Sequence, residues 1–358
     1  MILSMRWFGP GHDTIPLRFL RQVPGLKGVV TTLYGSLPGE VWEAAAIRRL
    51  QEEVASAGLA ITGIESLNVH DAIKAELKER DHYIDNYITS LSRLGEAGIK
   101  LVCYNFMPVF DFTRTELAHL REDGAAVFSY DQAVIDTIDP GRMNEHMERI
   151  SQGFVMPGWE KERVRELQRL FELYQGVDSE ALFHNLVYFL KALMPVCQRY
   201  GIRMALHPDD PAWPVFGLPR IAGDLPGLLR IVQAVDHPSN GITLCTGSLG
   251  TRRDNYIPGI IHALQGRIPY AHVRNLRHTV PGRFEESAHL SADGSLDMYA
   301  IMKAFYDTGF DGVLRPDHGR AIFDEVAMPG YGLYDRAIAC GYLSGLWEAL
   351  GKQGKGGA

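Results

Sequence analysis

The segment GVLRPDHGR, residues 312–320, joins a short apolar run to a dense group of ionisable side chains. The apolar run is typical of a buried β-strand. The residues that follow include Arg315, Asp317, His318 and Arg320, which is more ionisable chemistry than strand interiors or ordinary surface turns hold. In α/β barrels, functional side chains stand at the carboxyl ends of the strands. The segment therefore indicates a strand that delivers polar residues to a functional site.

Seven other runs of this kind recur along the chain, and they are nearly continuous in apolar character rather than alternating. Amphipathic helical patterns separate them, and three of these end at glycines suited to helix C-termini, Gly58, Gly98 and Gly201. We expect Ser179 to cap the start of the third helix. Alternating strands and helices indicate right-handed βαβ units, and eight units predict a single closed (β/α)8 TIM barrel over residues 1–350. The eight runs are residues 5–9, 28–33, 60–66, 100–106, 203–208, 241–247, 268–275 and 312–318.

An open, doubly wound sheet is the alternative architecture. It is disfavoured because no G-x-G-x-x-G motif follows the first run. The connection after the fourth run, residues 107–178, is too long for a simple barrel loop, and its second half has a helical pattern. We expect a long, largely helical insertion there, acting as a lid or a dimer contact. The Gly- and Lys-rich residues 351–358 are predicted to form a disordered tail.

Composition excludes some classes of protein. The net charge of -7 and the lack of any basic block argue against a nucleic-acid partner. The four cysteines are widely spaced, which favours reduced thiols and a cytoplasmic protein. No apolar stretch approaches the ~20 residues that a membrane span requires, and no secretory signal is expected at the N-terminus.

Four side chains of metal-ligand type end the last four predicted strands: His207, Cys245, His272 and Asp317. Each one alone has a simpler interpretation, as a hydrogen-bonding histidine or a small buried cysteine. Together they predict a site for one divalent cation, because neighbouring strands lie only ~4.8 Å apart. Cysteine and histidine favour Zn²⁺, whereas the carboxylate also suits Mn²⁺ or Fe²⁺, so the ligand types leave the metal open.

Further polar side chains are expected near the same strand ends. Arginines beside a metal suit a carboxylate ligand, because a guanidinium binds a carboxylate through two parallel hydrogen bonds. The alternative is ion pairing of these arginines with Glu65 or Asp317, and Glu65 could instead support a metal-binding histidine. The predicted substrate-binding side chains are Arg6, Trp7, Glu65, Asn105, Arg274, Asn275 and Arg315, with Asn68 and His70 close to Glu65 in the sequence.

Long ordered motifs also carry a resemblance to a known family. They include MRWFGPGHD, GVVTTLYGSLPGEVW, GIKLVCYNFMPVFDFTRT, MALHPDDP, AHVRN, FEESAHLSADGSLDMY and RPDHGR. With these motifs spread over nearly the whole chain, the sequence resembles the mannonate dehydratase family, which has a xylose-isomerase-like barrel. The resemblance implies a hydro-lyase that removes water from D-mannonate to give 2-keto-3-deoxy-D-gluconate in glucuronate catabolism.

The resemblance also implies a cofactor and roles for individual residues. Mn²⁺ or Fe²⁺ is the expected cofactor, and Zn²⁺ could take its place in a crystal. The family's metal ligands correspond to the four strand-end residues already identified. The family also implicates His318 and Tyr331, the latter in MPGYGLYDR, and a small sugar acid as the partner. A homodimer or higher homo-oligomer is expected.

This chemistry requires a general base for the weakly acidic C2 proton and a general acid for the departing C3 hydroxyl. We assign these roles to His318 and Tyr331 without deciding which residue takes which role. Asp317 is counted with them as a catalytic residue. The alternatives are an orienting histidine and a tyrosine packed on the barrel rim. His289, in the seventh strand–helix loop, is expected to close over the substrate, unless that loop is only surface structure.

Three rival functions remain at this stage. A metal-dependent sugar isomerase or epimerase of the same fold usually binds its metal with carboxylates and histidines, which makes Cys245 out of character. An abasic-site nuclease would need a basic groove, which the net charge of -7 does not favour. A non-catalytic sugar-acid-binding protein would be marked by a lost ligand, and all four ligands are present.

Overall fold

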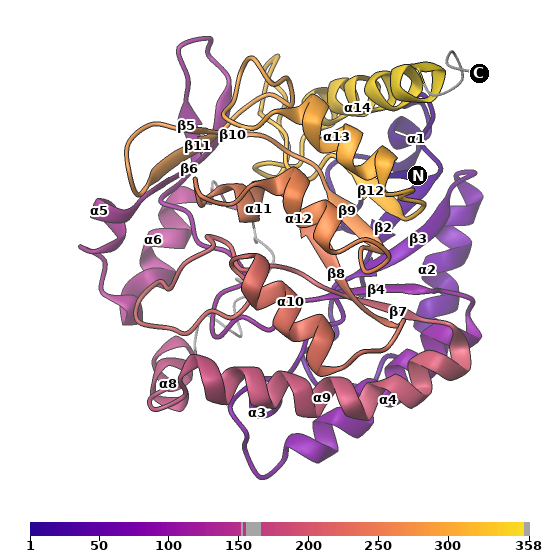
Figure 1. Cartoon of the computed structure of the whole chain (residues 1–358), viewed down its shortest axis with the longest axis vertical. Coiled ribbons are helices and arrows are strands. Elements are labelled where there is room, and N and C mark those ends of the chain that lie inside the picture. The colour runs from indigo at the N-terminus through magenta and orange to yellow at the C-terminus, as the bar shows by residue number, and fades with distance from the viewer. Residues whose placement is uncertain (152, 155–165, 354–358) are drawn as a thin grey trace.

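The computed structural model describes residues 1–151, 153–154 and 166–353, and its centre is a closed barrel of parallel strands (Figure 1). The order around the barrel is β1-β12-β9-β8-β7-β4-β3-β2. All eight predicted strands are confirmed, and so is the TIM-barrel architecture. The barrel strands are β1 (Ile2–Arg6), β2 (Gly28–Thr31), β3 (Ala60–Glu65), β4 (Leu101–Tyr104), β7 (Arg203–Leu206), β8 (Asn240–Cys245), β9 (Tyr270–His272) and β12 (Val313–Arg315).

The pairing of these strands sets the height of their final residues. Cys245 at the end of β8 lies opposite His272 at the end of β9, and His272 in turn lies opposite Arg315 at the end of β12. β8 is buried along its whole length, as expected for a strand with other structure on both faces. The parallel register therefore brings several polar strand ends to one level of the barrel.

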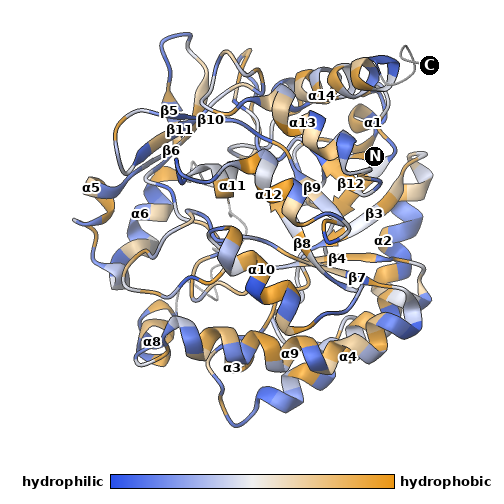
Figure 2. Ribbon diagram, in the orientation of Figure 1, coloured by the Kyte–Doolittle hydropathy of each residue, from blue (hydrophilic) through white to orange (hydrophobic). Residues whose placement is uncertain are grey.

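Helices surround the barrel and turn their apolar sides toward it, as the hydropathy colours of Figure 2 show. Left-handed glycines follow the predicted helices, with φ of +72° at Gly58, +79° at Gly98 and +64° at Gly201. The prediction for Ser179 is wrong by one residue, because the side chain of Asp178 caps this helix by accepting a bond from Ala181 N. The main helices are α2 (Ala44–Ser56), α4 (Arg80–Glu96), α9 (Ser179–Tyr200), α10 (Leu225–Ala234), α12 (Ile257–Ala263), α13 (Met298–Asp307) and α14 (Leu333–Gln353), with short α1 (Leu17–Leu20), α3 (Asp71–Lys74) and α11 (Thr246–Gly250).

The insertion after β4 differs from the expected helical segment, because its first half is a β-hairpin. β5 (Glu116–Leu120) and β6 (Ala126–Asp131) pair with β10 (Leu276–His278) and β11 (Arg283–Glu286) in an antiparallel sheet of order β10-β11-β6-β5. The pair Asp123–Gly124 makes the hairpin turn, with φ of +82° at the glycine. The remainder contains short helices, α5 (Gln132–Ile135), η1 (Pro140–Arg142), α6 (Met143–Ile150) and α8 (Leu167–Leu173), while the expected helical residues 155–165 lie outside the described part of the chain.

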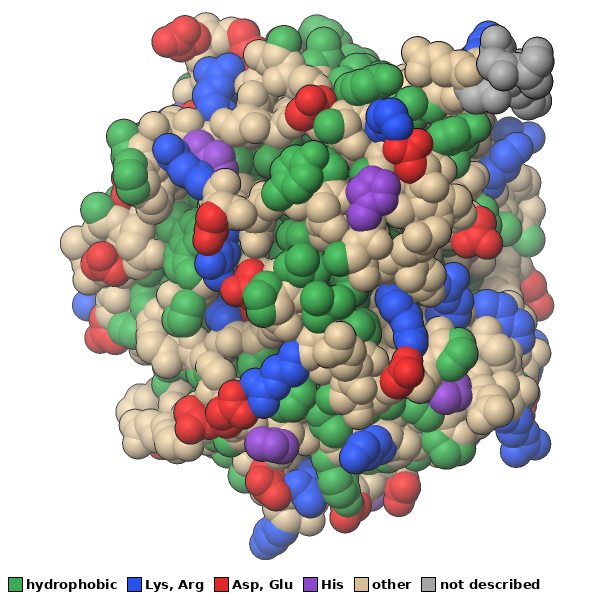
Figure 3. Space-filling view, in the orientation of Figure 1, with side chains coloured by type: hydrophobic (Ala, Val, Ile, Leu, Met, Phe, Trp, Pro, Cys, Tyr) green, Lys and Arg blue, Asp and Glu red, His purple; other side chains and the backbone are tan. Residues whose placement is uncertain are grey.

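Two further expectations concern the chain end and the surface. The tail was predicted to begin at residue 351, but α14 continues to Gln353, and residues 354–358 lie outside the described part. Among the described residues, every helix is too short or too polar to cross a membrane. In the space-filling view, basic and acidic side chains are intermixed over the visible face (Figure 3).

Close packing of α4 against α9 gives a test of the fold. A Cβ on Gly95 of α4 would stand 2.4 Å from Tyr200 Cγ, so Gly95→Ala forces the two helices apart. We expect it to lower the free energy of unfolding by about 1–3 kcal/mol in urea denaturation. Gly345→Ala on α14 is the matched control, because its Cβ meets nothing within 4 Å. We expect the control to be neutral or stabilising by up to ~1 kcal/mol, and equal destabilisation by both changes would contradict this packing.

Candidate active site at the barrel mouth

Three of the four predicted metal ligands lie together at the barrel mouth. His207 directly follows β7, Cys245 ends β8 and His272 ends β9. One ligand atom from each of the three lies within 4.8 Å of the others. The parallel register places Cys245 opposite His272, whereas Leu206, just before His207, pairs with Ile242 of β8.

The hydrogen bonds of these side chains suit a divalent cation. His207 Nδ1 lies 2.7 Å from the carbonyl oxygen of Pro208, so this nitrogen donates and Nε2 keeps its lone pair. The sulfur of Cys245 accepts from the hydroxyl of Ser248 at 3.0 Å. Both ring nitrogens of His272 are buried and make no hydrogen bond of good geometry, although Nε2 lies 3.3 Å from Glu65 Oε2. The donor set and these two nitrogens fit a bound metal ion.

Asp317, the fourth predicted ligand, lies beside this cluster. Its Oδ2 is 3.4 Å from Cys245 Sγ, and its Oδ1 is 3.7 Å from His272 Nδ1. The same two oxygens contact Arg274 Nε at 2.6 Å and Arg315 Nη2 at 2.8 Å. Burial would raise the pKa of Asp317, but the nearby positive groups hold it well below its ordinary value. The carboxylate is therefore ionised, as a cation ligand must be.

An arginine–glutamate group forms the adjoining wall. Arg315 donates to both Glu65 oxygens, at 2.8 and 3.1 Å, so the ion-pair alternative for Arg315 is realised. Arg6 Nη1 lies 3.6 Å from Glu65 Oε2, and Arg6 Nη2 donates to the hydroxyl of Tyr34 at 3.0 Å. Tyr270 donates to the same Glu65 oxygen at 2.5 Å. Three guanidinium nitrogens in this group, Arg6 Nε, Arg6 Nη1 and Arg315 Nη1, have no hydrogen-bond partner.

A cavity at the barrel mouth collects most of the predicted site residues. Arg6, Glu65, Asn105, His207, Arg315, Asp317, His318 and Tyr331 all line it. The amide oxygen of Asn105 is buried without a hydrogen-bond partner, which leaves it available to a ligand donor. Residues that the sequence reasoning had missed also line the cavity, among them Thr32, Tyr34, Asp111, Phe112 and Asp210.

Three predicted substrate contacts lie elsewhere, and these predictions are not supported by position. Trp7 is 4% exposed and packs in the main apolar core. The Asn275 amide is occupied by backbone groups, since it donates to Leu290 and Leu296 and accepts from Leu276 and Leu296. His289 is buried and does not line the cavity, although neither of its ring nitrogens has a hydrogen-bond partner, and burial lowers its pKa to about 4. Position after a strand end predicted the depth of these residues but not the direction of their side chains.

Arg274 joins a buried ion network instead of lining the cavity. Besides Asp317, it donates to Glu286 Oε1 and Asp210 Oδ2, both at 2.8 Å. Arg114 binds the two Asp210 oxygens at 2.8 and 3.0 Å and reaches Glu286 Oε1 at 3.2 Å. The network therefore connects Glu286, in the antiparallel sheet, to Asp317, beside the metal-ligand cluster, through alternating positive and negative side chains.

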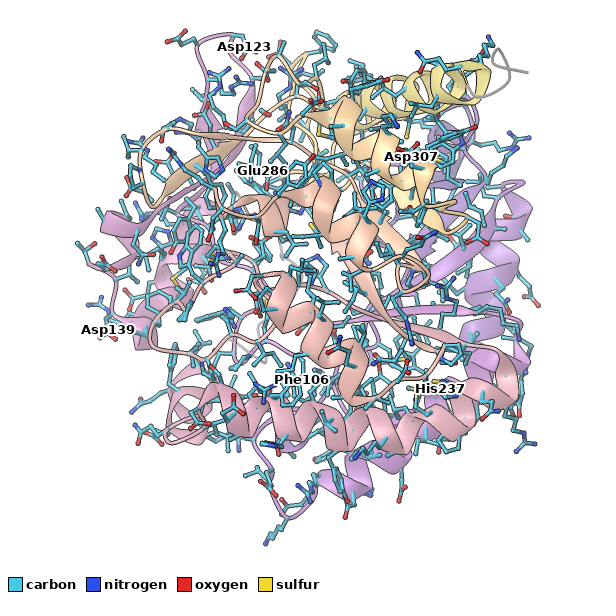
Figure 4. The ribbon with its side chains drawn as sticks, viewed as in Figure 1. Phe106, Asp123, Asp139, His237, Glu286 and Asp307 are labelled. Carbon is cyan, nitrogen blue, oxygen red and sulfur yellow. The ribbon has the colours of Figure 1, made fainter. Side chains whose placement is uncertain are left out.

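His318 and Tyr331 form a hydrogen-bonded pair, as their predicted shared role requires. His318 Nε2 lies 3.2 Å from the Tyr331 hydroxyl, and its Nδ1 lies 2.9 Å from Glu286 Oε1. Burial raises the pKa of Tyr331 well above its ordinary value, so its phenol stays protonated. Glu286 comes from β11, and Figure 4 labels it on the side of the barrel near the second sheet. Sequence reasoning missed Glu286, although it lies in the FEESAHLS segment.

Comparisons with known proteins agree with this geometry. The sequence pattern of the D-mannonate dehydratase (UxuA) family matches residues 1–356. A mannonate dehydratase of Brachyspira hyodysenteriae is 60% identical over 355 residues, covering 99% of this chain and 100% of that protein. A mannonate dehydratase of Enterococcus faecalis is 52% identical over 346 residues, covering 97% of each chain.

Two solved structures resemble this chain, one in sequence and fold and the other in fold alone. The crystal structure of mannonate dehydratase from Streptococcus suis serotype 2 has a TM-score of 0.90 and 38% identity, covering 99% of this chain and 96% of that one. A xylose isomerase domain protein from Planctomyces limnophilus has a TM-score of 0.54 at 12% identity, covering 98% of each chain. At that identity the likeness shows the barrel fold alone.

The ligand cluster generates a test that needs no substrate. Cys245→Ser replaces the thiolate by a weaker ligand, so we expect the affinity for Mn²⁺ or Zn²⁺ to fall at least about tenfold. Metal content after dialysis, measured by mass spectrometry, reports the change. Cys197→Ala on α9 is the control, because Cys197 is buried in the apolar core and is not part of the cluster. Equal metal retention in Cys245→Ser and the unchanged protein would contradict the assigned centre.

Proposed function

Because the chain belongs to the D-mannonate dehydratase family, we propose that the cavity at the barrel mouth is where it removes water from D-mannonate. The protein is a hydro-lyase that converts D-mannonate to 2-keto-3-deoxy-D-gluconate. In this reaction, C2 loses a proton and C3 loses its hydroxyl, which leave together as water. The resulting enol gains a proton at C3 and loses its hydroxyl proton to become the ketone. The observation that carries the proposal is the full-length family match combined with the strand-end ligand cluster.

The proposed cofactor is one divalent cation held by His207, Cys245, His272 and Asp317. When bound, it supplies Lewis-acid stabilisation of negative charge that develops on substrate oxygens. Mn²⁺ and Fe²⁺ are favoured because the set combines an ionised carboxylate with imidazoles. The thiolate of Cys245 explains why Zn²⁺ would compete for the same ligands.

We propose that Arg6 and Arg315 hold the substrate carboxylate. Both residues line the cavity. Each has at least one guanidinium nitrogen that donates no hydrogen bond to any described residue. Glu65 contacts both side chains and so fixes the spacing of the two positive groups. The unpartnered amide oxygen of Asn105 is suited to accept a hydrogen bond from a substrate hydroxyl.

The hydrogen bonds of His318 favour a division of the proton-transfer roles. Glu286 fixes the proton on Nδ1 of His318, which leaves the Nε2 lone pair as the base for the C2 proton. Tyr331 keeps its proton because burial raises its pKa, so its hydroxyl is the acid for the departing C3 oxygen. The 3.2 Å contact between the two groups lets a proton pass from His318 back to Tyr331.

We also propose the setting in which the enzyme works. The four cysteines are buried and form no disulfide, which supports a location in the reducing cytoplasm. The membership of the D-mannonate dehydratase family supports a role in glucuronate catabolism there. Exposed apolar side chains support a homodimer or higher homo-oligomer, because such residues commonly mark interfaces. They include Phe323 at 76% exposure and Val326 at 83%, with Tyr334 and Ile338 nearby in the sequence.

Turnover of D-mannonate tests the proposed site directly. The protein loaded with Mn²⁺ is expected to form a 2-keto acid from D-mannonate, detected with a keto-acid reagent and by mass spectrometry. Removal of the metal with a chelator is expected to abolish the product, and added Mn²⁺ is expected to restore it. The site would be wrongly identified if chelated and Mn²⁺-loaded protein formed product at the same rate.

Proton exchange in heavy water separates the two catalytic roles. We expect Tyr331→Phe to lose dehydration by about 10²- to 10⁴-fold while still exchanging the C2 proton, because the base remains. His318→Asn is expected to lose both dehydration and exchange. Loss of the C2 proton signal in nuclear magnetic resonance spectra measures exchange. If His318→Asn exchanged the proton and Tyr331→Phe did not, the roles would be reversed.

Glu286→Gln is the companion variant, since Glu286 contacts His318 but does not line the cavity. It is expected to lower kcat by at least about tenfold and leave KM nearly unchanged, because the histidine loses its fixed tautomer. A change in KM alone would contradict the positioning role of Glu286.

A further inference from the structure

A second cavity lies outside the barrel mouth, lined by residues from the start of α9, the start of α10 and the loop that follows β7. Figure 1 shows where α9 and α10 lie. Three arginines line it, Arg220, Arg230 and Arg252, together with the carboxylate of Asp224. Ser179, Phe183 and Trp213 form other parts of its wall. None of these residues belongs to the proposed metal centre or to the substrate site.

Arg220 differs from the two other arginines of this cavity. Arg230 is satisfied by Glu180, with two bonds of 2.6 Å, and Arg252 contacts Asp224 and Asp254, each at 3.0 Å. Arg220 is only 9% exposed, yet all three of its guanidinium nitrogens lack a hydrogen-bond partner. No carboxylate oxygen of the described residues lies within 4.0 Å of them. A buried cation without such contacts is unfavourable unless an anion or water meets it.

The neighbouring carboxylates do not fill this role. Asp209, Asp111 and Asp210 attract Arg220 from a distance. Asp209 Oδ2 accepts the backbone N–H groups of Ile221 and Ala222, at 3.0 and 2.7 Å, and Asp210 is paired with Arg114 and Arg274. Asp224 is likewise used by Gly227 N and by Arg252. The donors of Arg220 therefore remain for a ligand, and a planar guanidinium is suited to oxyanions such as phosphate or carboxylate.

We propose that the second cavity is a binding site for a small oxyanion, with Arg220 as its principal donor and Arg252 at its edge. The site is separate from substrate binding, because Arg220 lines this cavity and not the barrel mouth. The second cavity is nonetheless close in the chain to the proposed metal centre. Asp209, which organises the backbone next to Arg220, lies two residues after the metal ligand His207.

Calorimetric titration of the Mn²⁺-loaded enzyme with inorganic phosphate tests this site, with acetate in a parallel arm to separate phosphate from carboxylate recognition. We expect one phosphate per chain, and at least tenfold weaker binding in Arg220→Gln. Ser179→Glu is the second variant, because it adds a carboxylate to the cavity wall and keeps Arg220. Ser179 is exposed at the first position of α9, where an acidic residue favours the helix, so this variant is expected to fold. It too is expected to weaken phosphate binding at least tenfold.

Arg169→Gln is the matched control, since Arg169 is an exposed arginine of α8 paired with Glu166 and is expected to leave phosphate binding unchanged. Tighter binding of acetate than of phosphate would keep the site and assign it to carboxylates. The proposal is overturned if the unchanged enzyme binds neither anion. It is also overturned if both cavity variants bind as the unchanged enzyme does, which would place the anion at the barrel mouth. Inhibition that is competitive with D-mannonate and relieved by Arg220→Gln would equally overturn it, by assigning Arg220 to the substrate site.

Discussion

The parallel register of β8, β9 and β12 is the constraint on which the rest of the site depends. It places Cys245 level with His272, and His272 level with Arg315, without any loop needing to reach inward. A slip of one residue would turn each of these side chains to the opposite face of its strand. Chemistry at the barrel mouth is therefore positioned by the same backbone hydrogen bonds that close the barrel.

The buried charges near the barrel mouth are the second feature on which the site depends, because each must be paired with an opposite charge. Arg114, Arg274 and Arg315 are almost fully buried, and each contacts at least one buried carboxylate, Asp317 in the case of Arg315. Buried charges are tolerated only when they are paired, and removal of one partner is costly. The network therefore holds its members in fixed positions. Glu286 illustrates this, since it contacts Arg114, Arg274 and His318 at once.

Much of the fold and part of the site could be predicted from the sequence. Apolar runs identified all eight barrel strands, and residue types at strand ends identified the three clustered side chains that could hold a metal ion. The side-chain directions of Trp7 and Asn275 could not be predicted, because position at a strand end gives depth along the barrel and not orientation. Glu286 was missed because it reaches His318 through a sheet formed with a distant hairpin. The turn pair Asp123–Gly124 was the available signal for that hairpin.

The hairpin β5–β6 has a consequence for how the enzyme family can vary. Its tip is fastened on two sides, through Arg121 to Asp293 and through Asp123 to Arg320, and Ala126 pairs with Ala321 by two backbone bonds. These contacts tie the hairpin to the loops that follow β11 and β12. Ala321 lies only three residues from His318, so the hairpin supports the segment that carries this histidine. Substitutions in this hairpin would therefore change the support of His318 without altering a side chain that lines the barrel-mouth cavity.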